Sequence, residues 1–239
     1  MTAKLFLELF AGSCRMARSF AMHGIPAESF EVTRDARENV FSPENTGSIF
    51  ARMKKGRICL VWSGIACASW SRARRGRGYG CGFPPPLRGD TPDTIWGLPG
   101  LNSKDRWRVK LGNQSARWMV RVIRHAIKTK TPLIMENPAT SRLWLCPPIR
   151  RLLASASVVT LDACQYGAPW RKSTRLAAWN VDVSSLERRC VASHGICSRS
   201  KKPHQPLVGV APDGQFWTAK ASPYAFELCE AVSRLAHPS

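Results

Sequence analysis

The sequence has no apolar run that approaches the ~20 residues required for a membrane-spanning helix. Its apolar start, residues 1–10, is interrupted by Glu8 and is not followed by a small-residue cleavage site. A secretory signal is therefore not predicted, and residues 5–10 are typical of a first buried strand. No internal repeat is present, and no membrane partner is expected.

A disulfide framework is also missing. The chain has 9 cysteines, an odd number, and their spacing matches no framework of paired cysteines. Without an export signal, this usage favours a reduced, intracellular compartment such as the cytoplasm or the nucleus. Each cysteine is then core filler, a metal ligand or a nucleophile.

Acidic residues are scarce. The chain carries 36 Lys and Arg against 16 Asp and Glu, for a net charge of +20. Such a surface attracts polyanions, and nucleic acid is the expected partner because phosphate neutralisation releases counterions. A generally basic soluble protein is the alternative. The composition does not indicate an oligomeric state.

What is present is an alternation of strand and helix patterns, which predicts a parallel sheet with helices on both faces. We expect strands at 5–10, 27–32, 57–64, 132–136, 158–164 and 175–179. We expect helices at 14–22, 49–55, 113–130, 141–155 and 223–235, with the fourth possibly broken at Pro147-Pro148. The 239 residues suit one catalytic domain at 1–180 and a short basic appendage at 181–239 that ends in the closing helix.

Residues 72–104 break the pattern, because this stretch is rich in Arg, Gly and Pro and has no apolar period. Long loops of this kind in compact domains are usually functional or mobile. An ordinary disordered loop is the alternative.

The first predicted strand ends in Glu8-Leu9-Phe10-Ala11-Gly12-Ser13. A glycine between strand and helix lets the backbone approach a ligand, and an acidic residue after the next strand, Glu31, is placed to bind ribose hydroxyls. The phosphate-binding pattern GxGxxG is absent, which argues against NAD. Together these residues predict a nucleoside-containing cofactor.

Two reactive side chains follow buried strands at their carboxyl ends, where open α/β sheets bind ligands. Cys67 lies in Gly64–Ser71 (GIACASWS), and Glu136 begins Glu136-Asn137-Pro138. A thiol with a lowered pKa is a nucleophile, and a carboxyl group in a pocket exchanges protons. The alternatives are an inert buried cysteine and a helix-capping turn.

A further turn, CQYGAPWRKSTR at 164–175, carries Arg171, Lys172 and Arg175 toward the same edge. Arginine forks bind phosphates or base edges. A solvated basic hairpin is the alternative.

These four elements, in this order, resemble the DNA cytosine-5 methyltransferases over about residues 5–179. The cofactor turn of that family, acidic-Leu-Phe-Ala-Gly, is matched at 8–12, and its Gly-Phe-Pro-Cys-Gln-Pro-Phe-Ser element is matched in frame at 64–71. Its Glu-Asn-Val element is matched at 136–138 and its Tyr-Gly-Val-Pro turn at 166–169. Small phage and virus-like members share the Glu-Asn-Pro and Arg-Lys-x-Thr-Arg forms seen here.

The resemblance implies a Rossmann-like, S-adenosylmethionine-dependent methyltransferase fold that acts on DNA. Cys67 would add to carbon 6 of a flipped-out cytosine while Glu136 hydrogen-bonds to N3. The cofactor would be held by Phe10, Ala11, Gly12, Ser13 and Glu31. Substrate contacts would come from Arg72, Arg74, Asn137, Arg171 and Arg175.

The loop that follows Cys67 occupies the place of the mobile catalytic loop of the family. Its cations Arg72, Arg74, Arg75 and Arg77 would hold phosphates while the loop closes. Gly76, Gly78, Gly80 and Gly82 would let it move.

The sequence departs from the family at three places. The first turn has Gly12-Ser13-Cys14 instead of Gly-x-Gly, and Ala66 and Ala68 replace the proline and glutamine beside the nucleophile. About forty residues replace the target-recognition domain. A decayed scaffold that only binds nucleic acid therefore stays open, as do methylation of RNA and methylation of an exocyclic base amine.

A metal site is predicted in the polar segment after residue 180. Cys190, His194, Cys197 and His204 follow the spacing C-x3-H-x2-C-x6-H. Two thiolates and two imidazoles suit tetrahedral zinc, although the spacing matches no standard finger. We expect a structural zinc ion at these residues, with chance proximity as the alternative.

Overall fold

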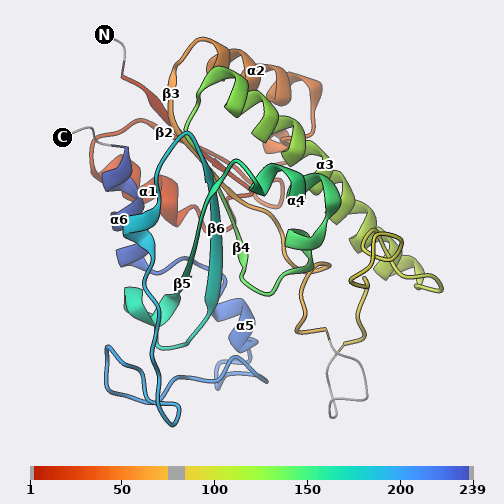
Figure 1. The fold of residues 1–239 in the computed structure, drawn as a ribbon, viewed down its shortest axis with the longest axis vertical. Coiled ribbons are helices and arrows are strands. Elements are labelled where there is room, and N and C mark those ends of the chain that lie inside the picture. Colours follow the sequence, from red (N-terminus) through yellow and green to blue (C-terminus); the bar gives the residue numbers. More distant parts are fainter. Residues whose placement is uncertain (1–2, 75–83, 237–239) are drawn as a thin grey trace.

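The computed structural model describes residues 3–74 and 84–236, which form one sheet flanked by helices (Figure 1). The sheet has six strands in the order β2-β1-β3-β4-β6-β5. In that order they span Ala27–Phe30, Leu5–Leu9, Ile58–Gly64, Leu133–Pro138, Ser173–Trp179 and Ser157–Asp162.

Strand direction shows how the sheet is wound. β1 pairs in parallel with β2 and β3, and β3 pairs in parallel with β4. β6 lies antiparallel between β4 and β5 and is thus the reversed strand of this sheet. The mostly parallel, Rossmann-like fold expected from the sequence is confirmed.

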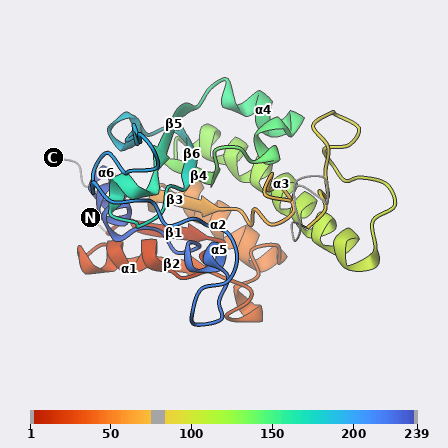
Figure 2. The same cartoon turned by 90° about the horizontal axis from the view of Figure 1, so that it is seen from below.

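Helices cover both faces of the sheet (Figures 1 and 2). Alternate residues of each central strand point to opposite faces, so Phe6 and Leu60 belong to one buried cluster and Leu7 and Val61 to the other. The first cluster includes α1 (Arg15–Met22) and α6 (Phe226–Leu235). The second includes α2 (Pro43–Lys54), α3 (Ser103–Thr129) and α4 (Pro147–Leu153).

Two helices begin earlier than predicted. α2 begins at Pro43, where the Ser42 side chain accepts a hydrogen bond from the amide of Asn45. α3 begins at Ser103, where the Asn102 side chain accepts one from the amide of Asp105. Both starts carry N-cap residues that outweigh the weak apolar period of the first turns. The broken helix expected at 141–155 is present as η3 (Arg142–Leu145) and α4, with Pro147 at the break.

The chain after β6 has little regular structure until α6, as predicted. It contains only η5 (Ser184–Leu186) and α5 (Trp217–Lys220) before the closing helix. α6 packs on α1, and its Leu228 and Val232 join the same buried cluster as Phe20. Within the described ranges, no helix is both long enough and apolar enough to cross a membrane.

Candidate active site

The loop between β1 and α1 has an unusual backbone. Phe10, Gly12 and Cys14 have φ angles of 57°, 52° and 55°. Only glycine adopts this region at no cost, so Phe10 and Cys14 need support from their surroundings. The Phe10 ring packs edge-on against Trp118, with ring centroids 5.8 Å apart. The loop is therefore held in a shape that turns its backbone toward the edge of the sheet.

Glu31 lies just after β2 and bonds to this loop. Its Oε2 accepts a hydrogen bond from the Gly12 amide at 2.8 Å, and its Oε1 accepts two from Thr33, at 3.0 and 2.6 Å. Partial burial opposes ionisation of Glu31, but the bonds from Thr33 and Gly12 together outweigh it and lower the pKa of the carboxyl group. An ionised Glu31 beside Gly12 is what a ribose-binding carboxylate requires.

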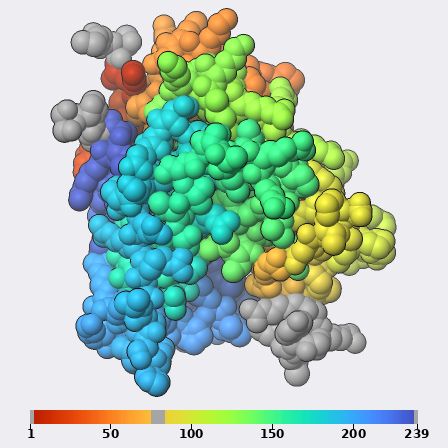
Figure 3. Space-filling model, in the orientation of Figure 1, coloured from red at the N-terminus to blue at the C-terminus, as the bar shows by residue number. Residues whose placement is uncertain are grey.

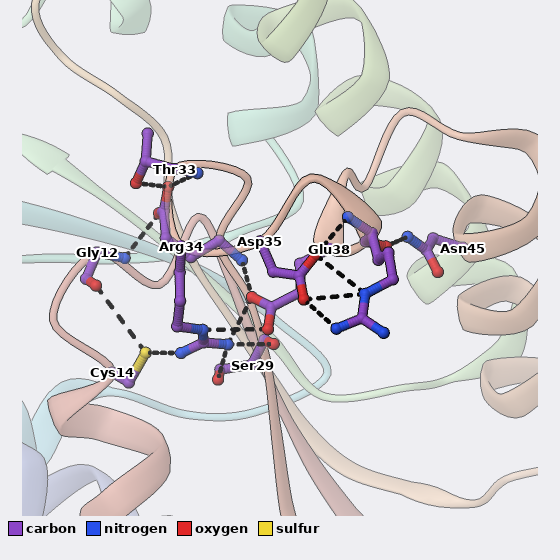
Figure 4. Close-up of polar contacts among 10 residues, drawn as sticks. Gly12, Cys14, Ser29, Thr33, Arg34, Asp35, Glu38 and Asn45 are labelled. Atoms are coloured by element: carbon purple, nitrogen blue, oxygen red, sulfur yellow. Dashed lines mark hydrogen bonds and ion pairs between the residues drawn. The ribbon is translucent and has the colours of Figure 1, made fainter.

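Arg34 bonds both to the loop between β1 and α1 and to the end of β2 (Figure 4). Its guanidinium donates to the Ser29 carbonyl and hydroxyl oxygens, at 3.0 and 2.9 Å, and to Glu38. It also donates to the sulfur of Cys14. Arg34 thus cross-links the end of β2 to the residue that begins α1.

The Cys67 loop is held by hydrogen bonds at several points. Asn137, which has no exposed surface, donates its side-chain amide to the Ile65 carbonyl at 2.7 Å. The Trp70 amide donates to the Cys67 carbonyl at 2.9 Å, and the Arg142 amide donates to the Trp70 carbonyl at 3.0 Å. The loop therefore has a defined shape without the proline that Ala66 replaces.

Arg88 also holds the Cys67 loop, through its bonds to Ser69. It is 1% exposed and lies over the Trp70 ring, 3.5 Å from the centroid. Its guanidinium donates to the carbonyl and hydroxyl oxygens of Ser69, the carbonyls of Ile95 and Val109, and the side chain of Asn113. Arginine has five N–H donors, and these five bonds use them all. Nothing in the local sequence indicates this role, because a buried arginine has the same sequence pattern as a surface one.

Glu136 pairs with Gly64 where β4 lies beside β3. Gly64 precedes Cys67 by three residues in the chain. Glu136 as a whole is 6% exposed, and its Oε2 accepts a hydrogen bond from the Tyr224 hydroxyl at 3.1 Å. Oε1 is buried and has no partner among the described residues. Burial raises the pKa of Glu136, against the lowering effects of Lys172 and Tyr224. A buried carboxyl oxygen without a partner is costly unless a ligand supplies one.

Cys67 lies within electrostatic reach of the same groups. Burial raises the pKa of its thiol, and the negative charge of Glu136 raises it further. Lys172 lowers it, and the Lys172 ammonium group is itself held by the Ala221 carbonyl at 3.1 Å. A protonated Glu136 would remove the repulsion and leave Lys172 to favour the thiolate.

These groups surround one cavity of about 490 Å³. Its walls come from the Gly12 loop, the Cys67 loop, the end of β4 and the segment before α6. Among its lining residues are Phe10, Ala11, Gly12, Ser13, Cys67, Arg74, Glu136, Lys172 and Tyr224. This volume falls in the ordinary range for small-molecule sites, and the cavity sits at the carboxyl edge of the parallel strands.

The structure thus brings together most of the predicted catalytic and cofactor residues. Glu31 and Asn137 are not among the lining residues, but each bonds to one, Glu31 to the Gly12 amide and Asn137 to the Ile65 carbonyl. Among the predicted cations, Arg74 lines the cavity and donates to the Pro85 carbonyl at 2.8 Å. Arg75, Arg77 and the loop glycines Gly76, Gly78, Gly80 and Gly82 lie outside the described residues.

The other predicted cations lie away from the cavity walls. Arg72 pairs with Asp90 at 2.8 Å, and Arg171 lies 3.5 Å from Asp162. Arg175 extends over the Trp144 ring, 5.5 Å from its centroid. Their contacts with a bound polymer remain predictions.

Lys172 and Tyr224 also line the cavity, although neither was among the predicted catalytic or binding residues. Lys172 lies between Arg171 and Arg175, which were predicted to bind substrate because arginine forms forked hydrogen bonds. The local sequence does not show which of the three cations reaches the cavity. Tyr224 is 88 residues from its partner Glu136. Only the packing of the chain before α6 places it in the cavity.

The predicted metal site needs one correction. Cys190, Cys197 and His204 do come together, but their fourth neighbour is Cys164, and all four ligand atoms lie within 4.8 Å of one another. His194 lies outside this group, because it is exposed in the turn that links Ser193 to Ile196, where its φ is 50°. Close spacing favoured His194 in the sequence, whereas the fold brings in a cysteine from the end of β5.

No protein-family model matches the chain, and no curated protein matches its sequence. Among solved structures, it is similar to the S. pombe Dnmt2 methyltransferase, with 13% identity, a TM-score of 0.39 and coverage of 74% of this chain and 49% of that one. It is also similar to the Entamoeba histolytica methyltransferase EhMeth, with 11% identity, a TM-score of 0.40 and coverage of 86% and 58%. The chain therefore spans 49% to 58% of the length of these two proteins. At such identity and TM-score the similarity says nothing about activity or substrate.

Proposed function

We propose that the chain transfers a methyl group from S-adenosylmethionine to carbon 5 of cytosine in DNA, through a covalent adduct with Cys67. The observation that carries this proposal is the shared cavity. Adjacent parallel strands deliver Cys67 and Glu136 into one space whose opposite wall is the Gly12 loop. The unpartnered Oε1 of Glu136 leaves one buried polar atom ready for a ligand.

The Gly12 loop and Glu31 would hold the cofactor. A β-carbon added at Gly12 would meet no atom within 4 Å, so the loop leaves open space on that side. The ionised Glu31 next to it is an acceptor for ribose hydroxyls. When bound, S-adenosylmethionine supplies a methyl group on a positively charged sulfur.

Glu136 would act on the base in its protonated form. Its raised pKa favours the neutral carboxyl group, which donates a hydrogen bond or its proton to N3 of cytosine. This withdraws electrons from the ring and makes carbon 6 electrophilic. The Tyr224 hydroxyl occupies Oε2, which would leave Oε1 as the oxygen that bonds to the base.

Cys67 would then complete the reaction in two stages. Its thiolate forms a bond to carbon 6 and moves the electron pair of the C5=C6 bond to carbon 5. Carbon 5 would then accept the methyl group that bound S-adenosylmethionine would supply from its sulfonium, which leaves a neutral thioether. Transfer of the carbon 5 proton to a water molecule restores the C5=C6 bond and expels the Cys67 thiolate.

A nucleic-acid substrate is proposed because of the charge of the chain and its resemblance to the DNA cytosine-5 methyltransferases. The net charge of +20 favours a polyanion, and the cation Arg74 stands in the cavity wall. A stacked base cannot reach Cys67, so the cytosine must be flipped out or single-stranded. The family that the chain resembles acts on DNA. RNA is the alternative, and the assay below distinguishes the two polymers.

The test is methyl transfer from labelled S-adenosylmethionine to DNA and, in parallel, to RNA, followed by nucleoside analysis. We expect label in 5-methylcytosine of DNA that disappears in Cys67→Ala and in Glu136→Gln. Cys59→Ala is the matched control, because Cys59 is a partly buried thiol on β3, the strand that leads to the Cys67 loop, and lies outside the cavity lining.

Three outcomes would contradict the proposal. Label in RNA alone would show that the substrate is RNA and not DNA. Label in an exocyclic amine that survives Cys67→Ala would overturn the mechanism. Folded protein that binds DNA but neither binds S-adenosylmethionine nor transfers its methyl group would indicate a scaffold that has lost its activity.

A further inference from the structure

Four metal-binding side chains from separate parts of the chain meet beside the end of β5. Cys164 belongs to η4 (Ala163–Tyr166), directly after that strand. Cys190, Cys197 and His204 come from the irregular segment after β6, which lies on the outside of the molecule, at the lower left (Figure 3). The three cysteines are buried and the histidine is partly buried.

The spacing of the ligand atoms matches a tetrahedral metal. With Zn–S at about 2.3 Å and Zn–N at about 2.0–2.1 Å, tetrahedral ligands lie about 3.8 Å apart for two sulfurs and about 3.6 Å for sulfur and nitrogen. The Sγ atoms of Cys190 and Cys197 are 3.9 Å apart, and Cys190 Sγ lies 3.6 Å from His204 Nε2. We propose that Cys164, Cys190, Cys197 and His204 bind one structural zinc ion.

Neighbouring polar groups are arranged to support thiolates. The amide and hydroxyl of Ser198 donate to Cys190 Sγ at 3.4 and 3.5 Å. The Gln165 side chain donates to the sulfurs of Cys164 and Cys197 at 3.6 and 3.7 Å. Three thiolates exceed the charge of Zn²⁺ by one, and such donors around the ligands disperse that excess.

The segment has no other core. Between Leu186 and Ala211, all of which is described, the buried residues are Cys190 and Cys197 alone. Ordering a residue costs about 1–2 kcal/mol of backbone entropy, which a stretch this polar cannot recover from apolar burial. Zinc coordination supplies folding free energy in such segments. Four protein ligands leave no open position, so the role is structural and not catalytic.

The ion would fasten this segment to the turn that carries Lys172. The amide of Gln205, next to His204, donates to the Pro169 carbonyl at 2.9 Å. Arg199 donates to the Gln165 carbonyl at 3.0 Å and pairs with Glu227 of α6 at 2.7 Å. The zinc site therefore joins the end of β5, the turn after it and α6 in one cross-linked unit. It stands independently of the methyltransferase proposal.

The test is the zinc content of the full chain, purified in the presence of a thiol reductant and then dialysed against metal-free buffer. We expect about one zinc ion per chain by inductively coupled plasma mass spectrometry, falling at least tenfold in Cys164→Ser. His194→Ala is the matched control and should keep the ion, since His194 is a histidine of the same segment outside the cluster. Retention by Cys164→Ser, or loss in His194→Ala, would overturn this ligand set.

Because Cys164→Ser alters a buried residue, a second variant guards against simple misfolding. His204→Cys keeps four soft ligands, so it should retain zinc. Cobalt(II) provides the spectroscopic test. The wild-type chain loaded with cobalt should show the visible bands of a tetrahedral thiolate site, and these should shift in His204→Cys. Folded wild-type chain that takes up neither metal, or a disulfide between Cys190 and Cys197 in the reduced preparation, would refute the site.

Discussion

The Tyr224 hydroxyl offers the sharpest perturbation of the site, because Tyr224→Phe removes one oxygen atom and keeps the ring. That hydroxyl donates to Glu136 Oε2 at 3.1 Å, and Oε1 has no partner in the described part of the chain. Within that part, the variant would leave both carboxyl oxygens without a protein partner. A hydrogen bond to a charged or buried group is worth about 1–3 kcal/mol, so we expect methyl transfer to slow by about 5- to 160-fold.

The same change should alter the pH dependence. Burial is the main cause of the raised pKa of Glu136, and the Tyr224 hydrogen bond works against it. Removing the hydroxyl therefore raises the pKa further. Because Glu136 acts in its protonated form, the rate falls as pH rises through this pKa, and in Tyr224→Phe that falling limb should move to higher pH.

The assay is single-turnover methyl transfer across a range of pH. Tyr166→Phe is the matched control, since its buried hydroxyl donates to the Leu186 carbonyl at 2.7 Å, away from the cavity. That variant should lose stability without a change in the pH profile. An unchanged rate and profile in Tyr224→Phe would refute the role given to Glu136.

Three other substitutions test the supports of the site. Burial raises the pKa of Glu8 from 4.5 to about 7. The folded protein therefore keeps the Glu8 proton after the unfolded chain has lost it, and the free energy of unfolding falls by about 3 kcal/mol as the pH rises from 4.5 to about 7. Glu8→Gln should remove this part of the decline, which urea unfolding of both proteins at pH 4.5 and pH 8 would reveal. Arg88→Lys replaces five donors with three, so at least two buried acceptors lose a partner and the free energy of unfolding should fall by about 3 kcal/mol in the same assay. Glu31→Ala removes the acceptor of the Gly12 amide and should weaken S-adenosylmethionine binding by about tenfold or more in calorimetry. Glu28→Ala, on the strand β2 that precedes Glu31, should not weaken it.

Much of the fold followed from local pattern. The buried strands β1 and β3 and the short helix α1 were predicted within about two residues, because apolar runs end at glycine or at a turn. The starts of α2 and α3 were missed, since they depend on the caps Ser42 and Asn102 and not on an apolar face.

The site divides in the same way. Residues that follow a strand directly, such as Cys67 and Glu136, were found because strand ends share one edge of a parallel sheet. Tyr224, Arg88 and Cys164 were missed because their roles depend on partners brought close by the fold. The buried Arg88 has the same local signature as a surface cation, and the contribution of Cys164 to the metal cluster depends on residues at least 26 positions away.

The central claim is that Cys67 bonds to carbon 6 of a cytosine, and a covalent trap tests it most directly. In a 5-fluorocytosine oligonucleotide the methylated adduct cannot lose a carbon 5 proton, so the Cys67–carbon bond should persist. With S-adenosylmethionine present, mass spectrometry should find the methylated nucleotide on the peptide that contains Cys67, and find none in Cys67→Ala. Formation of 5-methylcytosine in ordinary DNA by a protein that gives no such adduct, or by Cys67→Ala itself, would contradict the account.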